Sequence, residues 1–251
     1  MYELAQKVAL VTGGGRDIGR AVSMKLAHEG AAVVVNYFDN PADASETARM
    51  IMDGGGKAIA VQADATKADD VQKLVSKCIE TFGRHIHLLV NVAGGLVGRK
   101  KMEEMDEKFW DFVLDVNLKS AFLVTKAVLP HMPDGGAIVN FSSQAARDGG
   151  GFGAIAYSTA KGGVLTFTRG LAKELGPRKI RVNCISPGMI NTTFHNTFTK
   201  PEVRQKVAAM TPLGREGEAS EVADLVLFLA SARSSFINGE SIEINGGTYF
   251  V

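Results

Sequence analysis

The sequence predicts a doubly wound α/β fold, in which helices cover both faces of one parallel sheet. Three observations lead to this prediction: short apolar runs recur along all 251 residues, segments with a helical repeat lie between them, and a glycine-rich turn follows the first run. Strand, helix and strand repeated at this spacing give a parallel sheet with right-handed crossovers. No linker, charge block or internal repeat divides the chain, so we expect residues 1–251 to form a single domain.

Seven apolar runs are the expected strands. Most of them are continuous rather than alternating, which is typical of strands buried on both faces of a parallel sheet. They span residues 8–11, 32–35, 58–61, 88–92, 137–139, 182–185 and 242–244. Between the strands, residues 18–29 and 71–82 carry apolar side chains at helical spacing. The glycine clusters at 13–15, 54–56, 149–151 and 246–247 fall between or after these elements, where the backbone has to turn.

The composition is that of an ordinary globular protein. With 22% charged residues and a formal net charge of +1, the chain gives no reason to expect a nucleic-acid or anionic-membrane partner. Residues 1–7 do not resemble a secretory signal, no apolar run is long enough to span a bilayer, and Cys78 and Cys184 suggest a reducing compartment. We therefore expect a cytoplasmic protein. Neither the cysteines nor the five histidines have ligand spacing, so no metal is predicted; the histidines are His28, His85, His87, His131 and His195.

The turn after the first strand predicts a phosphate site. It reads Thr12-Gly-Gly-Gly-Arg-Asp-Ile-Gly19 and leads directly into a helix. Such a turn presents backbone N–H groups and the positive end of the helix dipole to an anion. The alternative is a tight turn that needs glycine only for its backbone angles. Its place between a strand and a helix favours the phosphate site.

A tyrosine and a lysine one helical turn apart suggest acid–base chemistry. Tyr157 and Lys161 are four residues apart, so their side chains share one face of a helix. A free tyrosine titrates near 10, too high for efficient proton transfer at neutral pH. A neighbouring ammonium stabilises the phenolate, and we expect Lys161 to lower the pKa of Tyr157 toward the working range.

These motifs together resemble the short-chain dehydrogenase/reductase family from end to end. The turn resembles the family's TGxxxGxG motif, and Tyr157 with Lys161 resembles its YxxxK pair. Residues 91–94, Asn-Val-Ala-Gly, resemble its NNAG motif, and Asn117 sits at the family's helical asparagine position. The resemblance implies a Rossmann-type fold and an NAD(P)(H)-dependent oxidoreductase that interconverts a ketone and a secondary alcohol by hydride transfer.

The resemblance also assigns catalytic roles. It implies that Tyr157 donates a proton to the substrate oxygen and that Lys161 also holds the nicotinamide ribose. Ser143 is the expected second donor, with Ser142 as the alternative, although Ser143 lies one residue farther from Tyr157 than is usual. We expect the glycine-rich segment 148–153 to absorb that residue. Asn117 would hold a water that links Lys161 to solvent.

The cofactor contacts follow from the same resemblance. The implied residues are Gly13, Gly15, Arg16, Asp17, Ile18, Gly19, Tyr37, Asp64, Ala65, Asn91, Ala93, Gly94, Tyr157, Lys161, Pro187, Gly188, Ile190 and Thr192. Relatives that prefer NAD carry an acidic residue at the end of the second strand, where this chain has Tyr37. The absence of an acidic residue at Tyr37 and the presence of the basic Arg16 in the turn favour NADP(H). Because Asp39 is close in sequence, NAD(H) is the alternative.

Two positions depart from the family pattern. Asp17 stands where the turn normally has its middle glycine, and a carboxylate there would repel a pyrophosphate. We expect Asp17 to cap the following helix and to point away from the phosphates. Val92 replaces the second asparagine of NNAG, which should change local hydrogen bonding without abolishing cofactor binding.

The segment after Pro187-Gly188 should form a mobile lid over the substrate. Met189, Phe194, Phe198 and the loop 149–152 suggest a partly apolar pocket, although these aromatic side chains could equally pack the lid onto the body. The likeness is to 3-oxoacyl-acyl-carrier-protein reductases and to sugar or small-ketone dehydrogenases. A carrier protein would need a basic docking patch, and residues 129–136 contain no Arg or Lys.

Other functions stay open from the sequence alone. The fold could serve a non-catalytic dinucleotide-sensing module, or an epimerase or dehydratase that keeps its cofactor bound. The phenol–ammonium pair argues against the sensor, which has no need of it. Gly162 and Gly163 suggest close approach of another backbone. In the family this helix and segments like 234–239 and 246–247 lie at subunit interfaces, so we expect a homotetramer, with a dimer as the alternative.

Overall fold

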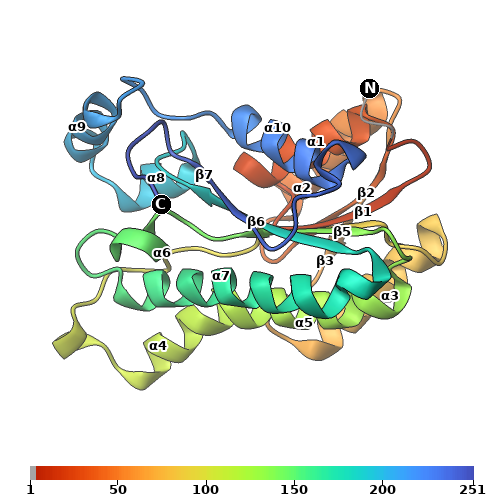
Figure 1. Ribbon diagram of the computed structural model, residues 1–251, viewed down its shortest axis with the longest axis horizontal. Helices are drawn as coiled ribbons and strands as arrows, with labels where there is room; N and C mark the ends of the chain where they lie inside the picture. The colour runs from red at the N-terminus through yellow and green to blue at the C-terminus, as the bar shows by residue number, and fades with distance from the viewer. Residues whose placement is uncertain (1–3) are drawn as a thin grey trace.

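The computed structural model describes residues 4–251. Residues 1–3, which belong to the segment 1–7 considered above as a possible secretory signal, lie outside the described residues. The described residues build a seven-stranded sheet with the order β3-β2-β1-β4-β5-β6-β7 (Figure 1). Every neighbouring pair of strands is parallel. The strands are β1 Val8–Thr12, β2 Ala32–Tyr37, β3 Lys57–Gln62, β4 Leu88–Asn91, β5 Ala137–Phe141, β6 Arg181–Pro187 and β7 Ser241–Ile244. All seven predicted strands and the predicted fold class are confirmed.

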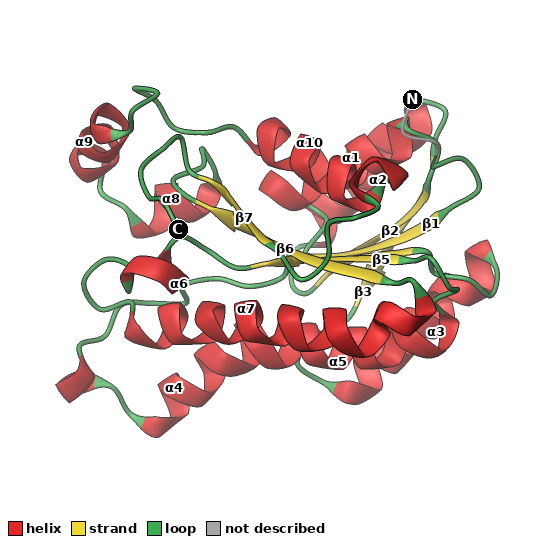
Figure 2. Ribbon diagram, in the orientation of Figure 1, coloured by secondary structure: helices red, strands yellow, loops and turns green. Residues whose placement is uncertain are grey.

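Helices lie above and below this sheet (Figure 2). One face is covered by α1 Asp17–His28, α2 Pro41–Asp53 and α10 Ala219–Ala230, and the other by α3 Ala68–Phe82, α4 Glu107–Leu114, α5 Ser120–Val128 and α7 Ile155–Leu175. Near the carboxyl ends of the strands lie the shorter helices α6 Ala145–Asp148, α8 Thr193–Phe198 and α9 Pro201–Met210. Short 3₁₀ turns occur at Met102–Glu104, Leu129–His131, Gly176–Arg178 and Ala232–Ser234.

The core has two parts, one on each face of the sheet. Val22, Leu26 and Val226 fill the α1–α10 side, and Leu74 and Val128 belong to the α3–α5 side. Each fully buried side chain of this size contributes about 1.5–3 kcal/mol of burial free energy. β1 and β5 are buried along their whole length because both faces of the sheet are covered. This explains why the strands read as continuous apolar runs.

A π-helix, Asp115–Lys119, joins α4 to α5. It packs against α7, where a Cβ on Gly163 would lie 2.8 Å from the Leu118 side chain. Gly163 therefore makes room for Leu118 of the same chain, and Gly162 has open space around its Cα. Within residues 4–251, the neighbour of Gly163 is thus a side chain and not a second backbone.

The strand order reverses direction between β1 and β4. From β1 the sheet grows outward through β2 and β3, and from β4 it grows the other way. Such a switch point opens a crevice at the carboxyl ends of the strands, where ligands bind in this class of fold. Among the helices of residues 4–251, none combines the length and apolar character needed to cross a bilayer.

Candidate active site

The glycine turn after β1 is packed too closely for side chains. A Cβ on Gly19 would lie 2.0 Å from the Gly13 carbonyl oxygen, and one on Gly15 would lie 3.0 Å from the Cα of Ala44. Gly13 has φ +62°, and its Cβ would lie 3.2 Å from the Cα of Ala93. The turn therefore exposes main chain at the start of α1, where the first N–H groups have no partner inside the helix. This cradle fits the pyrophosphate of a dinucleotide.

Polar side chains from neighbouring strands hold the turn in place. The Thr12 hydroxyl accepts a hydrogen bond from the Ala93 N–H at 3.1 Å, which joins the ends of β1 and β4. Asn36 accepts from the Gly14 N–H through its carbonyl oxygen at 2.9 Å and from the Gly13 N–H through its amide oxygen at 3.4 Å. Sequence reasoning missed Asn36 as a support. Its signal was present, because Asn36 is a polar residue inside an otherwise apolar run.

Side chains of α2 and α1 also support the turn. Thr47 donates from its hydroxyl to the Gly15 carbonyl at 2.7 Å, and the Arg20 Nε donates to the same carbonyl at 3.1 Å. Arg20 also reaches the Asp43 carboxylate at 3.6 Å. These contacts were not expected from the sequence, because Thr47 lies in a helix that shows no motif.

Asp17 does not have the role that the sequence predicted. α1 begins at Asp17, and its N-cap residue Arg16 makes no side-chain capping bond. The Asp17 carboxylate instead accepts the Thr193 N–H at 3.0 Å and the Thr193 hydroxyl, and it lies 3.9 Å from the Arg16 Nε. The predicted helix cap is therefore wrong. The carboxylate is turned toward the first residue of α8.

The Ser143 side chain lies beside the Tyr157 phenol and lowers its pKa. Ser142 faces the opposite way, since its hydroxyl is buried and donates to the Lys161 carbonyl at 2.8 Å. Of the two serines, Ser143 is therefore the one that reaches the phenol. Burial raises the pKa of Tyr157, and Ser143 offsets part of that rise.

Lys161 is buried beneath the tyrosine. Its Nζ donates to the Phe141 carbonyl at 2.8 Å and lies 5.8 Å from the centroid of the Tyr157 ring. Burial lowers the pKa of Lys161 to about 8. We expected the ammonium to lower the pKa of Tyr157, and this expectation is wrong for the described chain, because burial outweighs any such effect.

Asn117 lies in the π-helix and fastens the loop after β4. Its side-chain oxygen accepts the Gly95 N–H at 2.9 Å, and its amide donates to the Gly95 carbonyl at 2.8 Å. A Cβ on Gly94 would lie 2.7 Å from this oxygen and 3.0 Å from the Nζ of Lys161. Asn117, Gly94 and Lys161 therefore form one close group, and π-helical segments often occur at functional sites.

Two predicted cofactor residues have side chains engaged within the protein. The Asn91 amide donates to the Asn140 side chain at 2.9 Å and to the Thr125 hydroxyl at 3.2 Å. The amide nitrogen of Asn91 is therefore engaged within the protein, while its buried side-chain oxygen has no hydrogen-bond partner among residues 4–251. Asp64 accepts from the N–H and the hydroxyl of Thr66, at 2.9 and 2.7 Å, in a local turn.

Other predicted residues lie along the same edge. Tyr37 ends β2 and is partly buried, while Arg16 is well exposed at the turn. Ala65 is buried in the core, one residue after Asp64. At the end of β6, Gly188 follows Pro187, and a Cβ there would lie 2.7 Å from the Asn245 side chain.

The segment that the sequence predicts to be a lid begins beyond this glycine. Ile190 is buried and forms a bridge with Gly217, and the Thr192 hydroxyl donates to the Ile190 carbonyl at 3.1 Å. The Phe194 ring then lies 6.2 Å from the Tyr157 ring, between centroids. The lid therefore lies against the predicted catalytic group.

α9 fastens the far part of the lid. Arg204 binds the Glu216 carboxylate through two nitrogens and also donates to the side-chain oxygens of Asn191 and Asn196. The Phe194 and Phe198 rings pack against each other with centroids 5.3 Å apart and planes tilted by 59°. Within residues 4–251, no group of three or more His, Cys, Asp or Glu side chains could hold a metal ion.

Comparison with known proteins supports one family. The family described as Enoyl-(Acyl carrier protein) reductase matches residues 13–249. A (3R)-3-hydroxyacyl-CoA dehydrogenase of Mus musculus is 39% identical, with 98% of this chain and 97% of that protein covered. A 3-oxoacyl-[acyl-carrier-protein] reductase of Synechocystis sp. is also 39% identical, with 98% of each chain covered.

Solved structures give the same result. A short-chain dehydrogenase/reductase from Serratia marcescens superposes with a TM-score of 0.92 at 34% identity, covering 98% of this chain and 99% of that one. A blue fluorescent protein from a metagenomic library, in complex with NADPH, has a TM-score of 0.92 at 32% identity and covers 99% and 100%. The fold, the turn and these matches define an oxidoreductase of Rossmann type. The chain belongs to the short-chain dehydrogenase/reductase family.

Proposed function

We propose that this protein reduces a carbonyl group with NADPH and that Tyr157 is the general acid. The observation that carries the proposal is the closeness of the Ser143 side chain to the Tyr157 phenol, at the carboxyl ends of the strands and beside the phosphate turn. Two hydroxyls aimed at one point can both hold a substrate oxygen. The bound cofactor would supply the hydride.

The proton chemistry follows from burial. Because the pKa of Tyr157 is raised, the phenol is protonated at neutral pH and is ready to donate to the oxygen that becomes an alkoxide. Ser143 stabilises the developing charge on that oxygen. Lys161 keeps its ammonium below a pH of about 8, holds the cofactor ribose, and balances the phenolate left by Tyr157. Asn117 fixes the loop beside Lys161 and orders the water that returns the proton.

NADP(H) is the proposed cofactor, with NAD(H) as the weaker one. Tyr37 carries no charge to repel a 2′-phosphate, and the exposed guanidinium of Arg16 is free to approach one. The contact between Arg16 and Asp17 spans 3.9 Å and is exposed, so it restrains the guanidinium little.

A 3-oxoacyl thioester is the proposed substrate. Two relatives of this chain are named for 3-hydroxyacyl or 3-oxoacyl thioesters. Phe194 and Phe198 supply an apolar wall beside Tyr157, which suits an acyl chain. A carrier with anionic groups needs cations near the entrance, and residues 129–136 supply none.

The loop after β4 carries three consecutive cations at residues 99–101. Lys100 is paired with Asp106, and Lys101 lies near Glu103 and Glu104. Arg99 donates to the Phe152 carbonyl at 2.9 Å, the Lys100 N–H donates to the Gly153 carbonyl at 3.1 Å, and the Lys101 Nζ lies 5.7 Å from the Phe152 ring. Arg99 also acts electrostatically on His195 in the lid. This cationic loop, residues 99–101, therefore borders both the lid and the Gly149–Gly153 segment.

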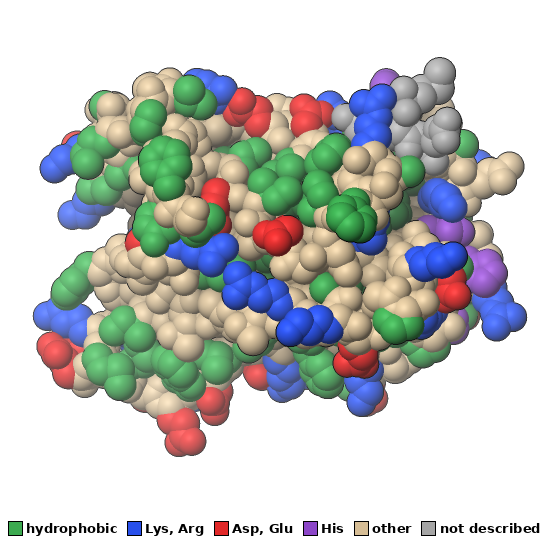
Figure 3. Space-filling model, viewed as in Figure 1, with side chains coloured by type: hydrophobic (Ala, Val, Ile, Leu, Met, Phe, Trp, Pro, Cys, Tyr) green, Lys and Arg blue, Asp and Glu red, His purple; other side chains and the backbone are tan. Residues whose placement is uncertain are grey.

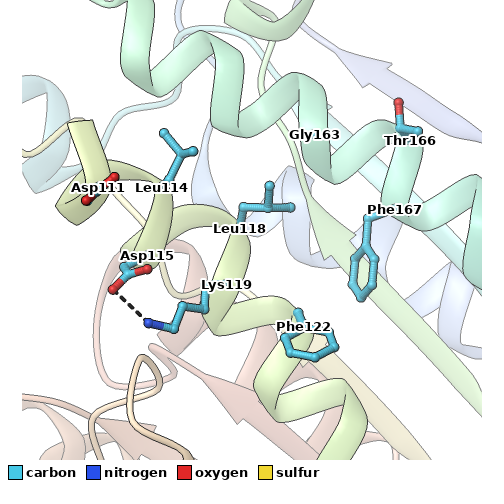
Figure 4. A pocket seen from close by; sticks show the side chains of 9 residues that line it. All are labelled: Asp111, Leu114, Asp115, Leu118, Lys119, Phe122, Gly163, Thr166 and Phe167. Atoms are coloured by element: carbon cyan, nitrogen blue, oxygen red, sulfur yellow. Dashed lines mark hydrogen bonds and ion pairs between the residues drawn. The ribbon is translucent and has the colours of Figure 1, made fainter. Parts of the chain in front are cut away.

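We further propose a homotetramer, with a dimer as the alternative, in the cytoplasm. An apolar groove of about 610 Å³ lies beside α7, where Leu118 of the π-helix, Phe122 of α5 and Phe167 of α7 line it near Gly163 (Figure 4). Hydrophobic side chains also gather over α4 and over α8 and α9 on the face in Figure 3. Surfaces of this kind mark interaction sites, and a second copy of the chain is the proposed occupant.

A substrate panel tests the proposal. NADPH oxidation would be followed by absorbance with 3-oxoacyl thioesters, sugars and simple ketones, with Tyr157→Phe as the blank. We expect turnover with 3-oxoacyl thioesters that the variant lacks. Binding of NADPH without any turnover would instead support the dinucleotide sensor, and conversion of substrate without net NADPH oxidation would support an epimerase or dehydratase.

A further inference from the structure

We propose that Asp17 is a positioning residue that tethers the lid to the phosphate turn and thereby controls how fast the cofactor enters and leaves. Its carboxylate accepts two hydrogen bonds from Thr193, one from the main-chain N–H at 3.0 Å and one from the hydroxyl. Thr193 is the first residue of α8. A carboxylate at that position binds both of the donors that the helix start and its side chain offer.

The backbone at Asp17 is held in an unfavourable conformation. Its φ is +49°, in the left-handed region that favours glycine. A residue with a Cβ persists there only when its surroundings hold it in place. The two bonds to Thr193 provide that hold. A glycine would satisfy the turn with less strain, so the strain points to a role that only a side chain can have.

The tether spans the crevice. Thr193 contacts Asp17 on the phosphate turn, while its neighbour Phe194 lies 6.2 Å from the Tyr157 ring. Two consecutive lid residues therefore reach the two halves of the site, one at the end of β1 and one on α7. A dinucleotide that extends from the turn to Tyr157 has to pass beneath this pair of contacts. Opening the lid at this place requires breaking the Asp17 bonds.

The far end of the lid is fastened independently. Arg204 binds Asn196, near the end of α8, as well as Asn191 and Glu216. Loss of Asp17 would therefore release the start of α8 while its other end stays attached. The expected result is a lid that swings about the Arg204 contact rather than one that unfolds.

The negative charge of Asp17 and its hydrogen bonds to Thr193 affect cofactor binding in different ways, and two substitutions separate these effects. The Asp17 carboxylate is negative and close to the phosphate cradle, which weakens binding of an anionic cofactor. The tether acts on rates instead, because a fastened lid slows both entry and exit. Asp17→Asn removes the charge but keeps a side-chain oxygen that accepts from Thr193. Asp17→Gly removes both and relieves the backbone.

The first experiment measures the tether without any cofactor. Hydrogen–deuterium exchange of residues 193–198 would be compared in the wild type, Asp17→Gly, Asp17→Asn, Thr193→Val and Thr197→Val. Thr197 is the matched control, since its hydroxyl bonds only to the Thr193 carbonyl within α8. We expect exchange about tenfold or more faster in Asp17→Gly, a smaller rise in Asp17→Asn and Thr193→Val, and no change in Thr197→Val. Equal exchange in Asp17→Gly and wild type would overturn the proposal.

The second experiment measures cofactor rates and rests on the proposed function. Stopped-flow fluorescence of NADPH and of NADH would give association and dissociation rate constants for the same variants. We expect both constants to rise about fivefold or more in Asp17→Gly, and Asp17→Asn to bind more tightly with nearly wild-type dissociation. If neither dinucleotide binds the wild type, the proposed function fails while the exchange result still decides the tether. If hydrogen exchange is faster in Asp17→Gly but the cofactor rate constants are unchanged, the tether does not control cofactor entry.

Discussion

Lys161 donates its Nζ to the main-chain carbonyl of Phe141 at 2.8 Å, so the ammonium is anchored to the end of β5 beneath the phenol. Burial lowers the pKa of this lysine to about 8. Reduction needs the ammonium, because it balances the phenolate that Tyr157 becomes. We therefore expect kcat/KM for carbonyl reduction to be level below pH 8 and to fall above it, by about tenfold per pH unit, since kcat/KM reports ionisations of the free enzyme.

A variant distinguishes Lys161 from other titrating groups. In Lys161→Arg the guanidinium stays charged across this range, so the fall near pH 8 should disappear from whatever activity remains. The measurement is a pH profile of initial rates between pH 6 and about 10. A fall at the same pH in Lys161→Arg would assign it to another group.

The same pKa predicts a pH effect on stability. The unfolded lysine keeps its proton up to about 10.4, whereas the native one loses it near 8, so the unfolded state binds more protons between these values. Stability should therefore rise with pH in this window, by up to about 1.4 kcal/mol per unit from this group. Denaturant unfolding of wild type and Lys161→Met, at pH 7.5 and 9.5, would show the slope only in the wild type. An equal change in the free energy of unfolding between the two pH values in both proteins would contradict the lowered pKa of Lys161.

The two serines after β5 should respond differently to alanine. Ser143→Ala removes the hydroxyl beside Tyr157, so kcat should fall about 10²-fold or more. It also removes the acceptor of the Ala145 N–H, so the free energy of unfolding should fall by less than about 1 kcal/mol. Ser142→Ala removes the buried bond to the Lys161 carbonyl, so stability should fall by about 1 kcal/mol with a smaller effect on kcat. Each variant is the other's control. If Ser142→Ala instead causes the larger fall in kcat, Ser142 has the catalytic role.

The closeness of the glycine turn makes Gly19→Ala a severe change. The added Cβ would lie 2.0 Å from the Gly13 carbonyl oxygen, so the backbone has to move and the phosphate cradle is distorted. We expect NADPH affinity to fall by more than about tenfold. Gly170→Ala is the matched control, because it lies exposed in α7 with nothing within 4 Å of the new Cβ. It should leave binding unchanged and stabilise the helix by up to about 1 kcal/mol. Isothermal titration and thermal melts measure both.

Charge reversal tests the cationic loop, residues 99–101. Arg99→Glu with Lys101→Glu should lower kcat/KM about tenfold or more for a thioester on an anionic carrier, and much less for the same acyl group on a short neutral thiol. Lys57→Glu is the control, because Lys57 is exposed at the amino end of β3, away from the strand ends that form the crevice. Equal losses with both thioesters would mean that the loop shapes the pocket rather than recognising the carrier.

Sequence patterns predicted the strands well because their cause is local. Each buried strand needs a run of apolar side chains, and the run is visible wherever it occurs. The choice of Ser143 over Ser142, in contrast, depended on which hydroxyl turns toward α7, and adjacent residues on a strand end look alike in sequence.

The errors have non-local causes. The sequence predicts Asp17 as a helix cap because a helix follows it directly in the chain. Its actual partner, Thr193, lies 176 residues away and leaves no signal near Asp17 in the sequence. The pKa of Tyr157 was expected to fall because Lys161 is one turn away, but burial depends on the whole fold.

The π-helix Asp115–Lys119 makes the length of the chain critical at one place. A π turn holds one residue more than an α turn, and deleting one residue there would let α4 and α5 merge into an unbroken α-helix. Each residue on one side of the deletion would rotate by about 100° relative to the other. The Asn117 amide would then swing off Gly95. Substitutions are thus tolerable across this junction wherever their side chains fit, but a variant shortened by one residue would have to hold the loop at Gly95 by other contacts.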